Sequence, residues 1–336
     1  MAEYKGIHGT KVQDYTTDPD NPITGQVWYN ETANTLRVEA VTTVGAWATG
    51  ASLNVAKQSM GSAGSTSTAG LVFGGQTPGT GYITQTESYN GTSWTEVADL
   101  NTARDLMGGA GATNTASLAW GGRESNPTTS AKTESWNGSS WTEVNDLNTG
   151  REAMASTGGA PNTAALTFGG AAIPLPSTSK NETESWNGTS WTELNNLNQA
   201  RSYIGGFGIN TSALSYGGYN GSAYVSDTEL WNGTSWTEVN NLNTPRGQFQ
   251  NAGATGSSGL AAGGSPPNVA ITEEWNGTSW TETSDLPTSM SSGNGFGTSA
   301  SALAAGGNQT PGYTVTGNGY DWTGAGAPAI RTITTD

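Results

Sequence analysis

The chain has 336 residues, 49 glycines, 13 tryptophans, one histidine, no cysteine and a formal net charge of −15 at pH 7. The absence of cysteine excludes disulfide frameworks, thiolate zinc sites and cysteine nucleophiles, and the single His8 excludes triads built on several histidines. The negative charge disfavours nucleic acid and anionic membrane surfaces as partners, because both would repel this chain.

The N-terminal segment, residues 1–43, is predicted to be an arm that carries a small hairpin. Met1 is followed by Ala-Glu-Tyr-Lys-Gly, so no signal peptide is visible, and no run approaches membrane-spanning length. Residues 18–22, Asp-Pro-Asp-Asn-Pro, indicate an extended linker, because Pro22 and the lack of a downstream glutamate argue against an EF-hand. The hairpin is expected over residues 25–38.

A repeat dominates residues 44–327. The phrase aromatic-Asn-Gly-Thr/Ser-Ser-Trp-Thr-Glu occurs five times, and each copy follows an apolar run that ends in a glycine pair. A sixth pair, Gly306-Gly307, brings the number of units to six, with pairs 43 to 48 residues apart. A repeat of this length is typical of a solenoid or a propeller.

The second unit illustrates how each repeat is predicted to form four antiparallel strands. Small residues over 107–113 and an apolar run over 116–120 precede two alternating segments, 132–136 and 141–144. Asn137-Gly138 matches the N-glycosylation acceptor, but it predicts a type I′ turn, in which both central residues need positive φ. Four short strands every ~45 residues are typical of a propeller blade.

The sixth unit lacks an outer strand, and we expect the N-terminus to supply it. Residues 45–57 align without a gap on residues 93–104, so the strand 45–50 should complete the blade built from residues 291–320. In that blade Tyr320 is expected as the aromatic of the third strand, which leaves Trp322 without a place in the repeat. The outer-strand tryptophans, expected to be structural, are Trp47, Trp94, Trp141, Trp191, Trp236 and Trp280.

The repeat resembles the Kelch-type β-propeller family over about residues 44–320. The family pattern of Glu-x-aromatic, Trp and a following Arg is matched by Glu134, Trp136, Trp141 and Arg151 after a glycine pair, and the sixth unit departs from it with Met290 in place of Arg. The resemblance implies an all-β fold, a six-bladed propeller of four-stranded antiparallel blades closed by an N-terminal strand.

Repeated glutamates and arginines could form acid–base pairs, but identical residues in every unit indicate a structural task. The arginines expected in ion pairs between blades are Arg104, Arg151, Arg201 and Arg246. Residues 88–94 match the Asp box of sialidases only superficially, since they are one residue short and lack the aspartate. We therefore predict no catalytic residue, no metal ligand and no cofactor, and a protein that is not an enzyme.

The loops that follow the glycine pairs differ between units, and they are the candidate binding surface. In an up-and-down blade these loops share one face, whereas the uniform Asn-Gly turns share the other. The loops cover residues 76–84, 123–131, 171–180, 219–226, 265–270 and 308–313. The candidate contact residues are Tyr82, Arg123, Tyr219, Tyr224 and Tyr313. The alternative is that these loops have diverged because nothing constrains them.

The arm also resembles short N-terminal pieces of tailed-bacteriophage virion proteins, written Gly-x-x-Trp-Tyr-Asn ahead of Leu-Arg-Val, and the repeats are similar to predicted structural proteins of marine phages. These resemblances imply a virion structural protein, present in many copies on the tail, a fibre or the capsid. Residues 1–43 would attach it to other virion proteins, residues 44–327 would form the displayed propeller, and residues 328–336 a C-terminal tail. Its loops would bind a host-surface glycan or protein. The alternatives are an intracellular Kelch-type interaction module and a secreted carbohydrate-active propeller.

Overall fold

The computed structural model describes residues 12–19, 26–41, 44–125, 128–173, 178–311, 314–325 and 328–333. These residues form strands, turns and loops, and no helix able to cross a membrane occurs among them. The chain divides into two compact units. The larger unit comprises residues 46–323, and the smaller unit joins residues 1–45 to residues 324–336.

Each of the first five repeats folds into a four-stranded antiparallel sheet whose strands pair in sequence order, and the strands predicted for the second unit are present. The first two sheets contain β5 (Gly61–Thr66), β6 (Ala69–Phe73), β9 (Thr86–Tyr89) and β10 (Trp94–Val97), then β11 (Gly108–Thr113), β12 (Ala116–Trp120), β15 (Thr133–Trp136) and β16 (Trp141–Val144). The third and fourth contain β17 (Ala155–Ser156), β18 (Ala165–Phe168), β21 (Thr183–Trp186) and β22 (Trp191–Leu194), then β23 (Gly205–Ile209), β24 (Ser212–Tyr216), β25 (Thr228–Trp231) and β26 (Trp236–Val239). The fifth contains β27 (Gln250–Thr255), β28 (Ser258–Ala262), β29 (Thr272–Trp275) and β30 (Trp280–Glu282).

The sixth sheet combines the two ends of the larger unit. It contains β31 (Met290–Ser291), β32 (Asn294–Gly297), β33 (Ser301–Gln309), β34 (Thr314–Thr323) and, at its edge, β4 (Ala46–Gly50). Trp47 lies opposite Trp322 in the pairing of β4 with β34, and their ring centroids are 5.2 Å apart. The strand predicted at 45–50 is therefore present. The assignment of Tyr320 is wrong, because Trp322 pairs with Ala302 as Tyr89 pairs with Gly70.

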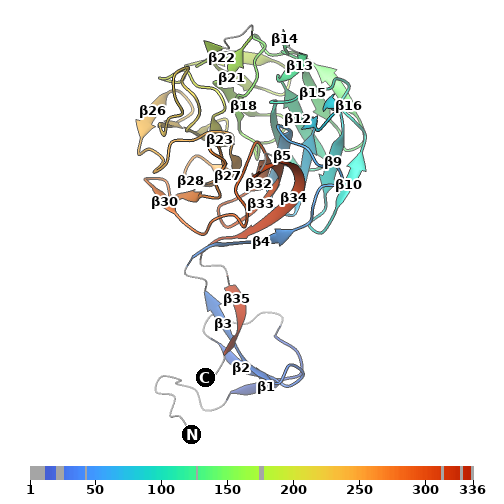
Figure 1. The fold of residues 1–336 in the computed structure, drawn as a ribbon, viewed down its shortest axis with the longest axis vertical. Coiled ribbons are helices and arrows are strands. Elements are labelled where there is room, and N and C mark those ends of the chain that lie inside the picture. The colour runs from blue at the N-terminus through green and yellow to red at the C-terminus, as the bar shows by residue number, and fades with distance from the viewer. Residues whose placement is uncertain are drawn as a thin grey trace. The chain divides into compact units, whose positions relative to one another are not determined.

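The six sheets surround a common centre, with β5, β23, β27 and β32 near it and β10, β26 and β30 at the periphery (Figure 1). Contacts run between neighbouring inner strands, and β32 of the sixth sheet contacts β5 of the first. Glycine is required where these strands approach closely, since a Cβ on Gly109 would lie 2.4 Å from the carbonyl oxygen of Ser62.

A ring of backbone hydrogen bonds precedes the inner strands, one residue from each unit. Each N–H donates to the carbonyl of the corresponding residue in the preceding unit, over 2.7 to 3.0 Å, and the first residue of the ring bonds to the last. All six have φ between 53° and 62°, a left-handed conformation that is uncommon for residues other than glycine. We call these residues the αL ring: Ser59, Leu106, Ala153, Tyr203, Gln248 and Ser292.

The hairpins at the outer edge are not the predicted type I′ turns. Trp136 pairs directly with Trp141, which leaves a four-residue loop, and within it only Gly138 has positive φ, at 93°. The side chain of Asn137 accepts hydrogen bonds from the N–H groups of Ser139 and Ser140, both at 2.9 Å. Asparagine is thus favoured here because its amide oxygen satisfies turn donors, not because its own backbone is left-handed.

The outer-strand tryptophans fill the spaces between neighbouring sheets. Trp141 packs edge to face on Phe73 of the preceding unit, with centroids 5.1 Å apart, and its Nε1 donates to Thr86 Oγ1 at 3.2 Å. The same donation to a threonine of a neighbouring sheet is made by Trp47, Trp191, Trp236 and Trp280. Trp94 donates to the carbonyl of Ala51 instead. All six tryptophans therefore join one sheet to another.

The smaller unit is a four-stranded sheet of β1 (Gln13–Tyr15), β2 (Val27–Asn30), β3 (Thr35–Val41) and β35 (Pro328–Ile333). The predicted hairpin is present as β2 and β3, and Asp18 Oδ1 accepts hydrogen bonds from Trp28 Nε1 and Asn30 Nδ2 at 3.0 and 2.8 Å. Residues 328–333, which the sequence analysis places in a separate tail, pair antiparallel with β3. Both ends of the chain thus contribute strands to one sheet.

Candidate functional site

The repeated charged residues form buried ion pairs, each between the segment that precedes an inner strand and the third strand of the same sheet. Arg104 Nη2 lies 2.8 Å from Glu134 Oε1, and Arg104 Nη1 donates to the carbonyls of Gly121 and Lys132, both at 2.8 Å. The second carboxylate oxygen, Oε2, accepts from the backbone N–H and the side-chain amide of Asn101, at 2.7 and 2.9 Å. The carboxylate is therefore occupied by neighbours within the fold.

The same arrangement recurs around the larger unit. The corresponding pairs are Lys57–Glu87, Arg151–Glu184, Arg201–Glu229 and Arg246–Glu273. Burial lowers the pKa of Arg104 and Arg201, and the charge of the paired glutamate opposes that shift. A guanidinium stays protonated in proteins, so the four arginine pairs offer no acid–base couple near neutral pH.

The sixth unit replaces this ion pair with uncharged residues. Tyr320 occupies the position of the glutamate, and its hydroxyl donates to Thr288 Oγ1 at 3.2 Å and accepts from Gln309 Nε2 at 3.1 Å. Met290, at the position of the arginine, is fully buried in an apolar cluster with Tyr320 and Leu286. The same position in the repeat can therefore be filled by a buried ion pair or by an uncharged pair.

The candidate residues of the variable loops fall into two pairs. The guanidinium carbon of Arg123 lies 5.2 Å from the ring centroid of Tyr82, and the rings of Tyr219 and Tyr224 are 5.4 Å apart. All three tyrosines are half-buried rather than fully exposed. Tyr313 lies outside the described residues. The first three variable loops form short hairpins: β7 (Gln76–Thr77) with β8 (Gly81–Tyr82), β13 (Arg123–Ser125) with β14 (Thr128–Thr129), and β19 (Ala171–Ala172) with β20 (Thr178–Ser179).

Two acidic residues that the sequence analysis did not single out accompany Arg123. Asp105 makes a bidentate pair with it, Oδ1 to Nε at 3.1 Å and Oδ2 to Nη2 at 2.8 Å, and Glu152 Oε2 lies 3.7 Å from Nε. Asp105 is 1% exposed and Glu152 4%, whereas the side chain of Arg123 is 25% exposed. Backbone bridges join Asp105 to Arg123 and Glu152 to Ala171, so the carboxylates lie at the base of the variable loops.

This cluster breaks the symmetry of the repeat. The corresponding position holds an uncharged residue in the other units: Gln58, Ser202, Gly247 and Ser291. Burial raises the pKa of Glu152, the charge of Arg123 opposes the rise and the charge of Asp105 adds to it. Glu152 Oε2 is buried and makes no hydrogen bond with any described residue, which leaves a strong acceptor unused.

Tyr203 of the αL ring lies close enough to this cluster to feel its charges. Burial raises the pKa of its phenol, and the charge of Glu152 raises it further. Tyr203 also lines a cavity of about 80 Å³ inside the αL ring, together with Leu106, Ala153 and Met154. The αL ring therefore lines a small cavity next to the backbone bridges that lead into the variable loops.

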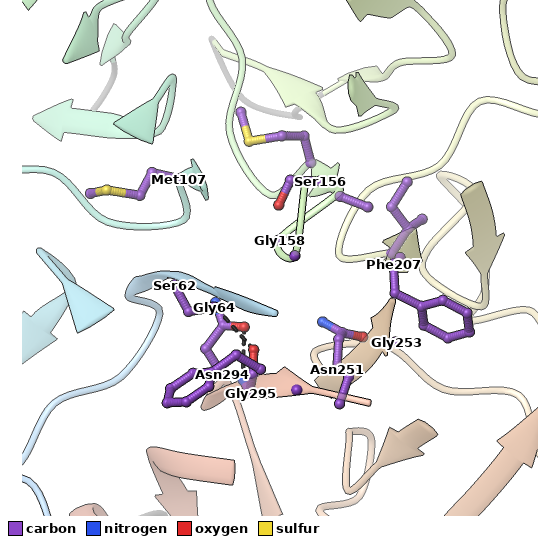
Figure 2. Close-up of a pocket in the computed structure, with 18 residues that line it drawn as sticks. Ser62, Gly64, Met107, Ser156, Gly158, Phe207, Asn251, Gly253, Asn294 and Gly295 are labelled. Carbon is purple, nitrogen blue, oxygen red and sulfur yellow. Dashed lines mark hydrogen bonds between the residues drawn. The ribbon is translucent and has the colours of Figure 1, made fainter. Parts of the chain in front are cut away.

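A second cavity of about 60 Å³ lies among the inner strands, where glycines alternate with the side chains of Ser62, Ser156, Asn251 and Asn294 (Figure 2). The carbonyl of Gly158 accepts hydrogen bonds from inner strands of two other units, at 3.2 and 3.3 Å. Both cavities are far smaller than the roughly 300–1,000 Å³ of a typical ligand pocket. These two cavities are therefore too small for a ligand of that size.

The sequence analysis missed three residues of this cluster: Asp105, Glu152 and Tyr203. A pattern in the repeat could have identified the acidic ones. These two occupy a repeat position that is otherwise neutral. Within the described part of the chain, no group of three or more His, Cys, Asp or Glu side chains is placed to hold a metal ion. No protein-family model matches the chain, and a search of curated proteins finds none similar to it. The site is therefore interpreted from its own geometry.

Proposed function

We propose that the larger unit is a closed six-bladed β-propeller of the Kelch type that acts in binding and not in catalysis. The six antiparallel sheets, the contact between β32 and β5 and the pairing of β4 with β34 support closure. The cyclic hydrogen bonds of the αL ring support it further, because each unit is bonded to its neighbour and the sixth to the first.

The contrast between two kinds of charged residue supports a binding function for the variable-loop face. The repeated glutamates are saturated by donors from within the fold, as at Glu134. Glu152 keeps an unused acceptor oxygen beside the partly exposed Arg123. Variation and a partly exposed charged side chain on one face of a repetitive scaffold are what a binding surface needs.

We propose, on the resemblance of the arm to tailed-phage proteins, that the chain is a virion structural protein present in many copies. The smaller unit, with its own four-stranded sheet, would attach it to other virion proteins, on the tail, a fibre or the capsid. The larger unit would then be displayed, with its loops available to a host-surface glycan or protein.

Labelling of intact particles tests this proposal. Antibody fragments raised against residues 46–323 of the full chain should decorate purified particles at regular positions in electron micrographs. Detection of the chain only in soluble lysate, with undecorated particles, would refute the virion assignment and favour an intracellular interaction module. Turnover of oligosaccharides by the purified chain would refute the non-catalytic assignment and favour a carbohydrate-active propeller.

A further inference from the structure

The two cavities of the larger unit are adjacent along its centre. The outer cavity, of about 80 Å³, lies inside the αL ring, and the inner cavity, of about 60 Å³, lies among the inner strands. Five residues line both of them: Met107, Met154, Ile204, Asn251 and Asn294. At the inner cavity the carbonyl of Gly158 in the third unit accepts from the N–H groups of Gly64 and Gly111 in the first and second units, so the chain crosses the centre there (Figure 2). A group that enters these cavities would therefore come in through the αL ring.

The αL ring gives the outer cavity a polar side and an apolar side. Three consecutive members of the hydrogen-bonded ring have polar side chains, and the other three present an aliphatic side chain or an aromatic ring. In ring order they are Gln248, Ser292 and Ser59, then Leu106, Ala153 and Tyr203. Of the described residues that line the two cavities, none carries a charge. The space therefore suits an uncharged group with one polar end and one apolar end.

The polar side offers two unused amide donors. Asn251 Oδ1 accepts a hydrogen bond from the hydroxyl of Tyr216, which fixes the orientation of the amide. Its Nδ2 makes no hydrogen bond with a described residue, stays in contact with solvent and points into the inner cavity (Figure 2). Gln248 Oε1 accepts from Ser292 Oγ at 3.1 Å, which leaves Gln248 Nε2 unused among the described residues. Both donors belong to the fifth unit, and each calls for an acceptor.

An uncharged carbonyl oxygen is the acceptor that fits. The chain carries a formal net charge of −15, and no described cation lines the cavities, so an anion entering them would lose its water without gaining a counter-charge. A purely apolar group would leave the amide donors of Gln248 and Asn251 unpaired. A carbonyl oxygen accepts hydrogen bonds without either cost.

The volume of the outer cavity limits the entering group to about four non-hydrogen atoms, since an engineered cavity of about 150 Å³ admits one benzene. The outer cavity has about half that volume, about 80 Å³. An acetamido group, in which a nitrogen, a carbonyl and a methyl are joined, has this size. Its carbonyl oxygen suits the amide donors, and its methyl suits the apolar side chains of Met154 and Ile204.

We propose that the αL ring binds the acetamido group of an N-acetylated sugar. The carbonyl oxygen accepts from the side-chain amides of the fifth unit, and the methyl group packs on the apolar side of the outer cavity. The sugar ring stays outside the cavity, where the residues that precede the αL ring are bridged to the variable loops. This inference rests on the proposed binding function of the variable-loop face and names the chemistry that is recognised there. No covalent bond is made or broken.

Matched pairs of immobilised sugars test the site with the full chain. N-acetylglucosamine, N-acetylgalactosamine and N-acetylmannosamine are compared with glucose, galactose and mannose, from which they differ only at the acetamido group. We expect at least one N-acetylated sugar to bind about 10-fold or more tightly than its partner, the gain expected from two neutral hydrogen bonds. Equal binding within every pair, or no binding to any of the sugars, overturns the inference.

Two leucine variants locate the site. Ala153→Leu fills the apolar side of the outer cavity and should abolish the preference for the N-acetylated sugar. The second unit already holds Leu106 at the same place in the αL ring, so the backbone should accept this change. Gln248→Leu removes one amide donor and should weaken binding of the N-acetylated sugar about 5-fold, the value of one hydrogen bond.

Ala98→Leu is the matched control, because Ala98 is exposed after β10 at the periphery and gains the same atoms as Ala153 does. It should bind the sugars as the unchanged chain does, and all three variants should keep its melting temperature. A preference that persists unchanged in folded Ala153→Leu or in folded Gln248→Leu overturns the site.

Binding to host cells separates this site from the proposed function. Loss of cell binding in Ala153→Leu supports both proposals. Cell binding that survives Ala153→Leu but is lost when one loop sequence replaces all six overturns the acetamido site alone. Cell binding that survives both changes overturns both proposals.

Discussion

Removing one partner of a buried ion pair should destabilise the larger unit strongly, and Arg104→Met is the sharpest test. The change keeps much of the side-chain volume but deletes the bond to Glu134 and those to the carbonyls of Gly121 and Lys132. Glu134 would then be a buried carboxylate served only by Asn101. Breaking a buried pair in this way costs about 3–5 kcal/mol of unfolding free energy.

The uncharged residues of the sixth unit suggest a second substitution that should restore the stability lost in Arg104→Met. Adding Glu134→Tyr to Arg104→Met copies the uncharged pair of Met290 and Tyr320, and Thr102 stands where Thr288 accepts the hydroxyl of Tyr320. Because uncharged replacements of a buried pair are often neutral, the double variant should recover most of the loss, to within about 1–2 kcal/mol of the unchanged chain.

Urea unfolding at pH 7, followed by tryptophan fluorescence and by circular dichroism, measures these differences as shifts of the midpoint. Lys180→Met, which breaks the partly exposed pair with Glu182, is the control and should cost less than about 1 kcal/mol. The reasoning is refuted if Arg104→Met stays within about 1 kcal/mol of the unchanged chain. It is also refuted if the double variant is no more stable than the single one.

Three further outcomes are expected. Burial raises the pKa of Glu152 above its usual 4.5. The Glu152 carboxyl therefore stays protonated to a higher pH in the folded state than in the unfolded state. The free energy of unfolding should fall as the pH rises from 4.5 through the raised pKa. Melting temperatures measured from pH 4 to about pH 7 should change less in Glu152→Gln, and identical profiles would contradict this. Trp47→Ala, which removes the packing on Trp322, should cost about 2 kcal/mol in urea unfolding, and an unchanged midpoint would argue against a structural role for β4. Gly122→Ala should lower the free energy of unfolding by about 2 kcal/mol or more in the same urea measurement. The φ of Gly122 is 92°, and the new Cβ would lie 2.5 Å from the carbonyl oxygen of Asp105. An unchanged midpoint would mean that the backbone adjusts at little cost.

Much of the fold could be predicted because the same pattern of four strands recurs in five copies of the repeat. The alternating segments located the outer strands, and the alignment of Trp47 on Trp94 located the strand that completes the sixth sheet. The predictions of turn type and of the sixth unit's aromatic position were wrong, because the same residue type can fill a position for two different structural reasons. Asn137 serves its turn through its side chain rather than through positive φ, and Trp322 takes the aromatic position assigned to Tyr320.

Other features were invisible because no local pattern encodes them. The αL ring consists of Ser, Leu, Ala, Tyr and Gln residues, and none of these residue types favours a left-handed backbone. The hydrogen bonds to neighbouring units must therefore impose this conformation. The pairing of residues 328–333 with β3 depends on segments almost 300 residues apart in the chain. At the site, Arg123 was predicted from variation alone. The acidic residues Asp105 and Glu152 do break the repeat, but their burial beneath the loops depends on backbone bridges that the sequence does not show.

The pairing of strands at the ends of the two units makes the larger unit an insertion within a hairpin of the smaller one. Val41 pairs with Pro328 at the end of β3 and the start of β35, and Ala46 pairs with Thr323 where β4 and β34 meet. The chain therefore leaves the smaller unit after β3 and returns to it at β35. Such a connection lets either unit be exchanged for another without rebuilding its counterpart. A chain that kept the small sheet would be able to carry a different domain between β3 and β35.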